Sequence, residues 1–244
     1  MKLLRDYWPL IPLASLTLLG LILRLYQLDW QCLMVDETVT LMIAAKTTSE
    51  IFVWSMQVDC NPPLYYLLAH WSTLLFGSIS DFAIRFPSVI LGTLAITISY
   101  LVGKEIRNTT LGLLSATIIS FMFPYVLYSQ NARGYMLVLV AFLGFTYFFV
   151  KIFNGDNGTK NTVCLAAFTA LCLWSHYYSI VPIGISLVIL FFTNKPEIKK
   201  IVQYCVVVTL TILPLISLAN IGNLWTFWPA RQTWPVNRPR LSRI

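Results

Sequence analysis

Charged residues are scarce in this chain. Of its 244 residues, 17 are Lys or Arg and 10 are Asp or Glu, while 57% are hydrophobic. So few charges cannot solvate the surface of a soluble globular domain, and several apolar runs are long enough to cross a bilayer. The composition therefore excludes an ordinary soluble protein and predicts a membrane protein.

The motifs of soluble nucleotide-dependent and hydrolytic enzymes are also missing. The sequence has no P-loop, no GxGxxG, no HExxH, no GxSxG and no internal repeat. An enzyme without these motifs has to use an activated substrate that already lies in the membrane. His70 and His176 stand alone in their segments, so no metal site is predicted. No cofactor is assigned, and a divalent metal stays an open alternative.

The net charge of +7 does not indicate nucleic-acid binding, because the basic residues do not gather into one face. They mark the ends of apolar runs, as the topology signals of membrane proteins do. These residues are Lys104, Arg107, Lys151, Lys160, Lys195, Lys199 and Lys200. Among the five cysteines, Cys32 and Cys60 share an acidic loop and pair only if that loop is oxidised.

The apolar runs predict a membrane topology. Hydrophobic segments lie at residues 9–25, 62–77, 84–103, 111–128, 135–152, 162–175, 178–193 and 201–219. If all of them crossed, the basic loops would lie outside, against the positive-inside rule. Segment 62–77 is short, begins with Pro-Pro and carries polar and aromatic residues, which favours a place along the interface. Without it, about seven spans remain and the basic loops lie on the cytoplasmic side with the N-terminus.

Three regions follow from this topology. Residues 1–219 form the transmembrane module, residues 26–83 its first extracytoplasmic loop, and residues 220–244 an extracytoplasmic tail. Arginines in that tail oppose the assignment, because they then lie outside. Segment 9–25 is expected to be a retained first span, with Arg24, Tyr26 and Trp30 as its interfacial anchor.

Carboxylates gather in the loop 26–83, which holds six of the ten acids. Asp36 and Glu37 precede an apolar run, and acids at such a position favour the positive end of a helix dipole. A carboxylate beside an apolar membrane surface can also have a raised pKa and act as a general base. Asp36 and Glu37 are therefore candidate catalytic residues, beside the alternative that they only start a helix.

Candidate substrate contacts lie on the same outer side. Asn61 is expected to cap a helix that starts with Pro-Pro, and free N–H groups at a helix start suit a phosphate. Arg85 opens a span, where an arginine either snorkels to the headgroups or binds a lipid-linked phosphate. Arg133 has a similar position between Asn131 and Tyr135, and these three residues are candidate substrate contacts as well. The two other candidates are aromatic: Tyr65 follows the prolines, and His176 lies in an aromatic turn where a packing role is also open.

These motifs together resemble the GT-C membrane glycosyltransferases, in particular the dolichyl-phosphate-mannose-protein mannosyltransferase family and its aminoarabinose transferase relatives. The resemblance covers about residues 9–193 and rests on four motifs in a fixed order: Asp36-Glu37, Asn61-Pro62-Pro63-Leu64-Tyr65-Tyr66, Ile84-Arg85-Phe86-Pro87-Ser88, and the decapeptide at 128–137. It implies an all-α polytopic fold, a GT-C-like bundle with juxtamembrane helices in the first outer loop.

The resemblance also implies a function. A sugar would pass from a polyprenyl-phosphate donor to an acceptor hydroxyl, on a protein or a glycolipid, at the extracytoplasmic face of the cell membrane. Asp36 would activate or orient that hydroxyl, and the other candidates would bind the donor phosphate or substrate. Relatives commonly carry an acid near Asn131 and are much longer, so this chain is expected to be an N-terminal part.

Two alternatives stay open from the sequence. One is a seven-span sensor or transporter without glycosyl transfer; a transporter needs ionisable residues within its spans, and between residues 86 and 219 the charges lie at the loops. The other is an inactive fragment of a glycosyltransferase.

Overall fold

The computed structural model describes residues 8–59, 61–194 and 198–221. Within these ranges the chain is helical and contains no strand. The longer helices are α2 (Leu10–Leu25), α6 (Asp81–Ile106), α7 (Thr109–Phe121), α9 (Tyr135–Phe153), α10 (Thr159–Ser175), α11 (Ile180–Asn194) and α12 (Ile198–Ile221). The shorter elements are α3 (Val35–Ala44), α4 (Thr48–Val58), α5 (Leu64–Phe76), α8 (Phe123–Ser129) and the 3-10 turn η1 (Tyr177–Ser179).

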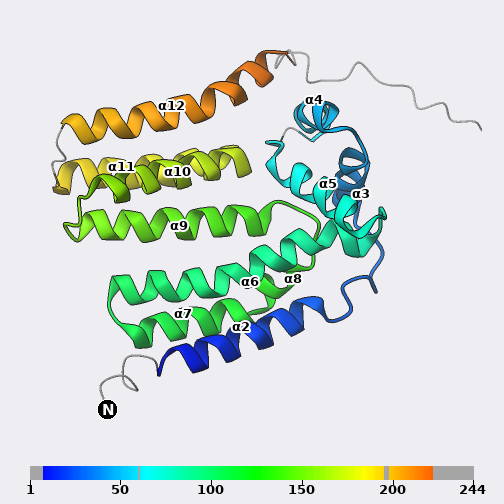
Figure 1. Cartoon of the computed structure of the whole chain (residues 1–244), viewed down its shortest axis with the longest axis horizontal. Helices are drawn as coiled ribbons and strands as arrows, with labels where there is room; N and C mark the ends of the chain where they lie inside the picture. The colour runs from blue at the N-terminus through cyan, green and yellow to red at the C-terminus, as the bar shows by residue number, and fades with distance from the viewer. Residues whose placement is uncertain (1–7, 60, 195–197, 222–244) are drawn as a thin grey trace, which may run out of the picture.

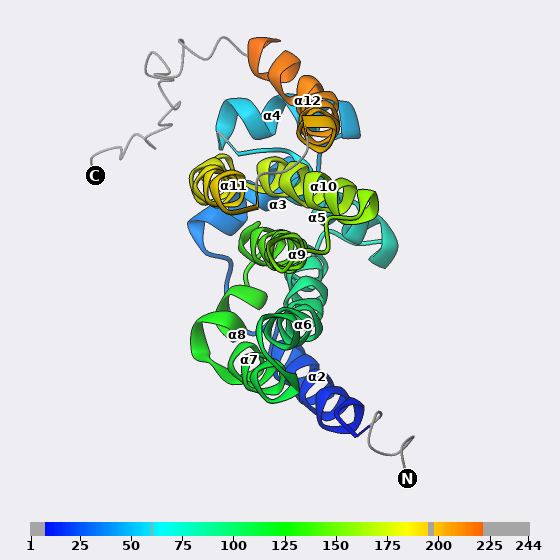
Figure 2. The same ribbon diagram turned by 90° about the vertical axis from the view of Figure 1, so that its left-hand side faces the viewer.

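The longer helices lie side by side in a row, and α3, α4 and α5 sit together at one end of it (Figure 1). Seen along the helices, α2, α6 and α7 form a group at one side, followed by α9, then α10 and α11, and then α12 (Figure 2). Successive long helices run in opposite directions. The loop with α3 to α5, the segment around α8 and the turn η1 therefore share one end of the bundle, while the α6–α7 and α9–α10 connections share the other.

Two helices, α6 and α9, are long and apolar enough to cross a membrane. The pair α7 and α8, bent by 58° at Met122, makes a third candidate if it counts as one span. Shorter apolar stretches occur in α2, α11 and α12. The prediction of an all-α polytopic membrane protein is confirmed, and its figure of about seven spans stays a prediction. Segment 62–77 forms the 13-residue α5, which lies with α3 and α4 (Figure 1), and its expected place along the membrane interface stays a prediction.

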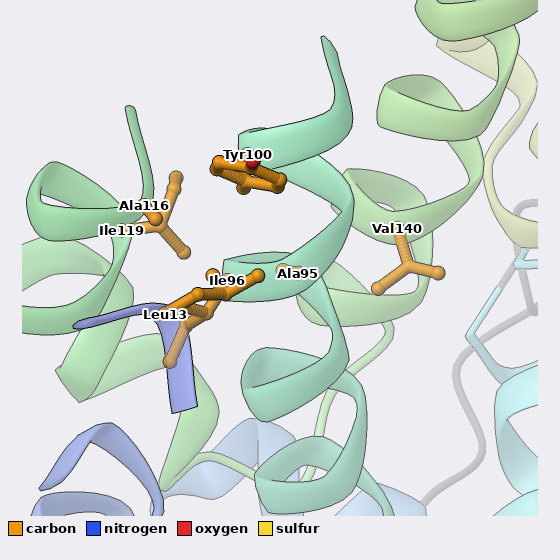
Figure 3. Close-up of a cluster of buried hydrophobic side chains, with 7 residues drawn as sticks. All are labelled: Leu13, Ala95, Ile96, Tyr100, Ala116, Ile119 and Val140. Carbon is orange, nitrogen blue, oxygen red and sulfur yellow. The ribbon is translucent and has the colours of Figure 1, made fainter. Parts of the chain in front are cut away.

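The centre of the α2–α6–α7–α9 group is an apolar cluster. Its members come from all four helices and point toward one another (Figure 3): Leu13, Ala95, Ile96, Tyr100, Ala116, Ile119 and Val140. Small residues allow the close approach of α6 and α7, as is common between helices in membranes. A Cβ atom on Gly112 would lie 2.6 Å from the backbone oxygen of Tyr100, and one on Gly103 would lie 2.8 Å from the backbone oxygen of Leu111.

One expectation about the first helix is wrong. Arg24 was expected to anchor α2 at the interface, but its side chain is 0% exposed and lies inside the bundle. Tyr26 and Trp30 are exposed, as an anchor requires. The proposed Cys32–Cys60 pair and the tail 222–244 involve residues outside the described ranges, so neither is tested here.

The contact between α6 and α7 leads to a first prediction. Replacing Gly112 with Ala should lower the stability of the bundle by about 1–3 kcal/mol, because the new methyl group meets backbone that cannot yield. Gly184→Ala in α11 is the matched control, since a Cβ there has nothing within 4 Å. Thermal unfolding in detergent would measure both, and equal melting temperatures for the two variants would contradict the close approach.

Candidate functional site

Glu37 and Arg85 form a buried ion pair at the end of the bundle that carries α3, α4 and α5 (Figure 1). Their side chains are 2% and 4% exposed, and the guanidinium meets both carboxylate oxygens at 2.8 Å. The other N–H groups of Arg85 donate to backbone oxygens of Leu28, Gln31 and Cys32, at 2.8 to 3.5 Å. All five donors of this arginine are therefore used inside the protein. Arg85 lies behind the pocket described below rather than in it.

The Glu37 carboxylate joins three separate segments. Besides Arg85 of α6, its oxygens accept the N–H of Met34 at 3.0 Å, which closes the start of α3, and the N–H of Ala132 at 2.8 Å. Burial by itself raises the pKa of Glu37, but the hydrogen bonds from Arg85, Ala132 and Met34 outweigh it and hold this pKa below its ordinary value. Glu37 is therefore ionised and fully engaged, which suits a positioning residue.

A second charge pair lies beside the first. Nη1 and Nη2 of Arg133 donate to the carboxylate of Asp59 at 2.6 and 3.3 Å. The same carboxylate accepts the hydroxyl of Tyr66 and, at 3.0 Å, the amide of Asn61. Burial lowers the pKa of Arg133, but the bonds to Asp59 more than compensate and raise it. The sequence analysis counted Asp59 only as one acid of the loop; its place two residues before Asn61 was the available signal.

Arg133 differs from Arg85 because one N–H group of its guanidinium has no hydrogen-bond partner within the described residues. Nη1 of Arg133 also approaches the backbone oxygen of Asp36 at 3.4 Å, but its Nε–H makes no hydrogen bond within the described residues. The side chain is 12% exposed, against 4% for Arg85. Of the two arginines predicted to bind a phosphate, Arg133 is thus the one with a donor still available.

Five of the predicted site residues line one small pocket. It has a volume of about 70 Å³ and lies between α3, α5, the loop before α9 and the end of α10. The predicted residues are Asn61, Tyr65, Arg133, Tyr135 and His176, and the others are Thr40, Pro62, Tyr66, Gly134 and Ser175. The structure therefore brings together residues that are more than a hundred positions apart in the sequence.

The pocket adjoins a large apolar groove. The groove has a volume of about 610 Å³, and it shares the side chains of Tyr135 and His176 with the pocket. Its remaining walls come from α8, α9 and the start of α11, with residues such as Tyr125, Leu139 and Pro182. Ligand-binding cavities commonly measure about 300–1,000 Å³, so the groove and not the pocket has room for the bulk of a ligand.

His176 stands at the boundary between pocket and groove with a defined hydrogen-bonding role. Its Nδ1 accepts the backbone N–H of Tyr178 at 3.3 Å, and its ring stacks on the ring of Tyr178. A neutral imidazole with an accepting Nδ1 carries its proton on Nε2. The Nε2–H is then a donor for a bound group.

Tyr65 ties the floor of the pocket together. Its hydroxyl donates to the backbone oxygen of Ile84 at 3.2 Å and lies 2.8 Å from the hydroxyl of Ser88, which in turn donates to the backbone oxygen of Arg133. Burial raises the pKa of Tyr65 well above its ordinary value, so the phenol stays neutral. Its ring lines the pocket while its hydroxyl holds α5 to α6.

Asp36 lies near Arg133, because its backbone oxygen is 3.4 Å from Nη1 of that arginine. It is exposed, and its carboxylate makes no hydrogen bond within the described residues. Asp36 and Thr40 are one helical turn apart and so share a face of α3, and Thr40 lines the pocket. Asp36 therefore carries a carboxylate without a hydrogen bond in the described residues and lies near Arg133, although it is not one of the residues that line the pocket.

Two expected roles change. Asn61 does not cap α5: that helix has Pro63 at its N-cap and no side-chain cap, and the Asn61 amide binds Asp59 instead. Pro63 also lacks the N–H group that another residue would present at the N-cap of α5. Asn131 packs its amide nitrogen 3.8 Å from the sulfur of Met34, and its buried Oδ1 has no partner within the described residues.

No group of three His, Cys, Asp or Glu side chains that could hold a metal ion occurs in the described part of the chain. The charged side chains of the site are instead paired as acid and base, Glu37 with Arg85 and Asp59 with Arg133.

Comparison with known families identifies the fold. Residues 60–219 match the family model described as dolichyl-phosphate-mannose-protein mannosyltransferase. The chain belongs to this family. The matched region includes Arg85, Arg133 and His176, while Asp36 and Glu37 precede it.

A solved structure supports the same architecture. A chain in the structure of the S. cerevisiae protein O-mannosyltransferase Pmt1–Pmt2 complex bound to the sugar donor is similar, with a TM-score of 0.66 and 17% sequence identity. The similarity covers 90% of this chain and 34% of the yeast chain, so this chain spans about a third of that relative. No curated protein sequence matches this one. This chain is therefore a membrane protein of the mannosyltransferase family and has a GT-C-like fold.

The buried pair leads to a second prediction. Glu37→Gln should destabilise the protein by about 3 kcal/mol or more, because it leaves the charge of Arg85 buried without a partner. Glu50→Gln is the matched control: Glu50 also accepts an N–H at the start of its helix, from Thr47 at 3.0 Å, but it is exposed. Thermal unfolding in detergent would compare them, and an equally mild effect of both substitutions would show that the buried pair is dispensable.

The lowered pKa of Glu37 gives a third prediction. A carboxylate whose pKa is lower when folded contributes stability above its unfolded pKa, near 4.5, and loses it as the pH falls through the folded value. The melting temperature of the wild type should therefore fall more steeply than that of Glu37→Gln below about pH 4.5. Parallel pH profiles for the two proteins would contradict the assignment.

Proposed function

We propose that this chain carries the donor site of a glycosyltransferase that moves a sugar from a polyprenyl phosphate to an acceptor hydroxyl. One observation carries the proposal: a small polar pocket with an available arginine donor adjoins an apolar groove, and Asp36, whose carboxylate is free within the described residues, lies near that arginine. An amphipathic donor with a charged phosphate and a long hydrocarbon tail matches this combination. Membership of the mannosyltransferase family supports the same class of donor.

In this proposal the phosphate lies between Arg133 and His176. The Nε–H of Arg133 and the Nε2–H of His176 donate to its oxygens, while Asp59 holds the guanidinium in place. The hydrocarbon tail follows the groove along α8, α9 and the start of α11. Arg85 and Glu37 act from behind, by fixing the loop that carries Arg133.

The transfer is a single displacement at the anomeric carbon. The acceptor oxygen attacks this carbon while Asp36 takes the hydroxyl proton, and the bond from carbon to phosphate oxygen breaks with its electron pair on the phosphate. Arg133 stabilises the negative charge that develops on the leaving phosphate. Attack opposite to the leaving group inverts the configuration of the sugar.

The site faces the extracytoplasmic side in this proposal. The described basic residues at the opposite end of the bundle include Lys104, Arg107, Lys151 and Lys160, which mark a cytoplasmic face by the positive-inside rule. The acceptor, a protein or a glycolipid, would then approach from outside the membrane.

The fourth prediction concerns Asp36. Asp36→Asn should lower the rate of transfer by about 10²–10⁴-fold, because the amide cannot take the acceptor proton. The measurement follows radiolabelled sugar from polyprenyl-phosphate donors in membranes that contain the chain.

Asp29→Asn is the control for this experiment, since Asp29 is another exposed acid of the same loop and lies outside the pocket. It should keep the wild-type rate. Full activity of Asp36→Asn beside an active wild type would overturn the role of Asp36. Inactivity of the wild type itself, in correctly inserted protein, would instead favour an inactive fragment or a sensor.

A further inference from the structure

A buried arginine in α2 is used by nothing described so far. Arg24 is 0% exposed and lies one residue before the end of an apolar helix. Within the described residues it has no acidic partner, because the ion pairs there involve Glu37, Asp59 and Asp156. An arginine held inside a membrane bundle is costly, so its position calls for a specific role.

The guanidinium of Arg24 binds the place where α7 breaks. Its Nη2 donates to the backbone oxygen of Ile119 at 2.7 Å, and its Nη1 donates to those of Ser120 at 3.3 Å and Gly20 at 2.9 Å. The oxygen of Ser120 would pair with residue 124 in a continuous helix, but Pro124 has no N–H. Arg24 therefore supplies donors where the backbone cannot.

The same side chain also holds the helix beyond the break. Nε of Arg24 donates to the hydroxyl of Ser129 at 3.0 Å, in the last turn of α8. Packing leaves no slack there, because a Cβ on Gly92 would lie 2.1 Å from that hydroxyl and 2.9 Å from Nε of Arg24. Next to it, the amide of Gln130 donates to backbone oxygens of Leu23, Arg24 and Tyr26. The last turn of α7 and the last turn of α8 are thus both fastened to α2.

Helix α8 is one wall of the apolar groove. Met122, Pro124, Tyr125 and Tyr128 line it from this side, and the bend of 58° turns α8 away from the axis of α7. The pocket is held independently, since Glu37 binds the N–H of Ala132 and Asp59 binds Arg133. A change at Arg24 therefore reaches the groove before it reaches the pocket.

We propose that Arg24 is a positioning residue that sets the shape of the groove and thereby its selectivity for a long hydrocarbon tail. The inference rests on the proposed function for the identity of that tail. Inside a bilayer the tail gains no hydrophobic energy by leaving other lipid chains, so its binding depends on how closely the groove fits it. A displaced α8 removes that fit.

The test compares binding of undecaprenyl phosphate and geranyl phosphate to detergent-solubilised protein. Arg24→Leu and Gly92→Ala should raise the Kd for the long lipid by about tenfold while leaving that for the short one near the wild-type value. Arg24→Lys should fall in between, since one ammonium cannot reach the same set of oxygens. Gly184→Ala, with nothing within 4 Å of its added carbon, is the matched control.

The outcomes separate this inference from the proposed function. If Arg24→Leu and Gly92→Ala bind both phosphates as Gly184→Ala does, or lose both equally, the positioning role is overturned. If the wild type does not prefer undecaprenyl phosphate to undecaprenol, or Arg133→Ala binds it equally well, the proposed donor site fails.

A distance measurement tests whether Arg24 holds α8 in position, even if the proposed donor site fails. Spin labels at Leu114 in α7 and Tyr128 in α8, with the other reactive cysteines replaced, report the bend between the two helices. Arg24→Leu should shift and broaden the distance distribution, whereas an unchanged distribution would overturn the role of Arg24 in holding α8.

Discussion

The arrangement of segments at the end of the bundle that carries α3, α4 and α5 depends on the carboxylate of Glu37. Two N–H groups of Arg85 and the backbone N–H groups of Met34 and Ala132 converge on its two oxygens. These donors come from the start of α3, the start of α6 and the loop before α9. Because a buried charge is tolerated only when it is paired and hydrogen-bonded, the three segments are held in one arrangement. That arrangement carries Asp36 outward on α3 and Arg133 toward the pocket.

The two acid–base pairs of the site divide the work between them. Glu37 and Arg85 satisfy each other and nearby backbone completely, so together they make a rigid support. Asp59 and Arg133 are more exposed, and the Nε–H of Arg133 has no hydrogen-bond partner within the described residues. The proposed chemistry uses this difference. A guanidinium that Asp59 orients, and that still has a free N–H group, can bind an anion without breaking its bonds to Asp59. The apolar groove beside the pocket would bind the hydrocarbon tail of the ligand, which charged groups cannot bind.

Much of the fold could be predicted from local patterns. Apolar runs predicted the helices, because helices depend on short stretches of sequence, while the place of α5 along the membrane interface stays a prediction. The partners of buried charges could not be predicted this way. Arg24 at the end of an apolar helix looks like a residue that snorkels, and only the break at Met122, almost a hundred positions later, explains why it turns inward. Asn61 before Pro-Pro looks like a cap, and only the fold shows that Asp59 takes its amide. Five of the candidate residues named from the sequence line one pocket, and their substrate-binding roles stay predictions.

The length of chain between the partners has a consequence for biosynthesis. Glu37 meets Arg85 48 residues later and Ala132 95 residues later, and the pocket is closed only by residues 175 and 176 near the end of α10. While the chain is being synthesised, the carboxylate of Glu37 in the loop 26–83 therefore has no buried counter-charge until α6, which carries Arg85, has been made. Assembly of the site is in this sense a late event, which follows the insertion of most of the bundle and does not precede it.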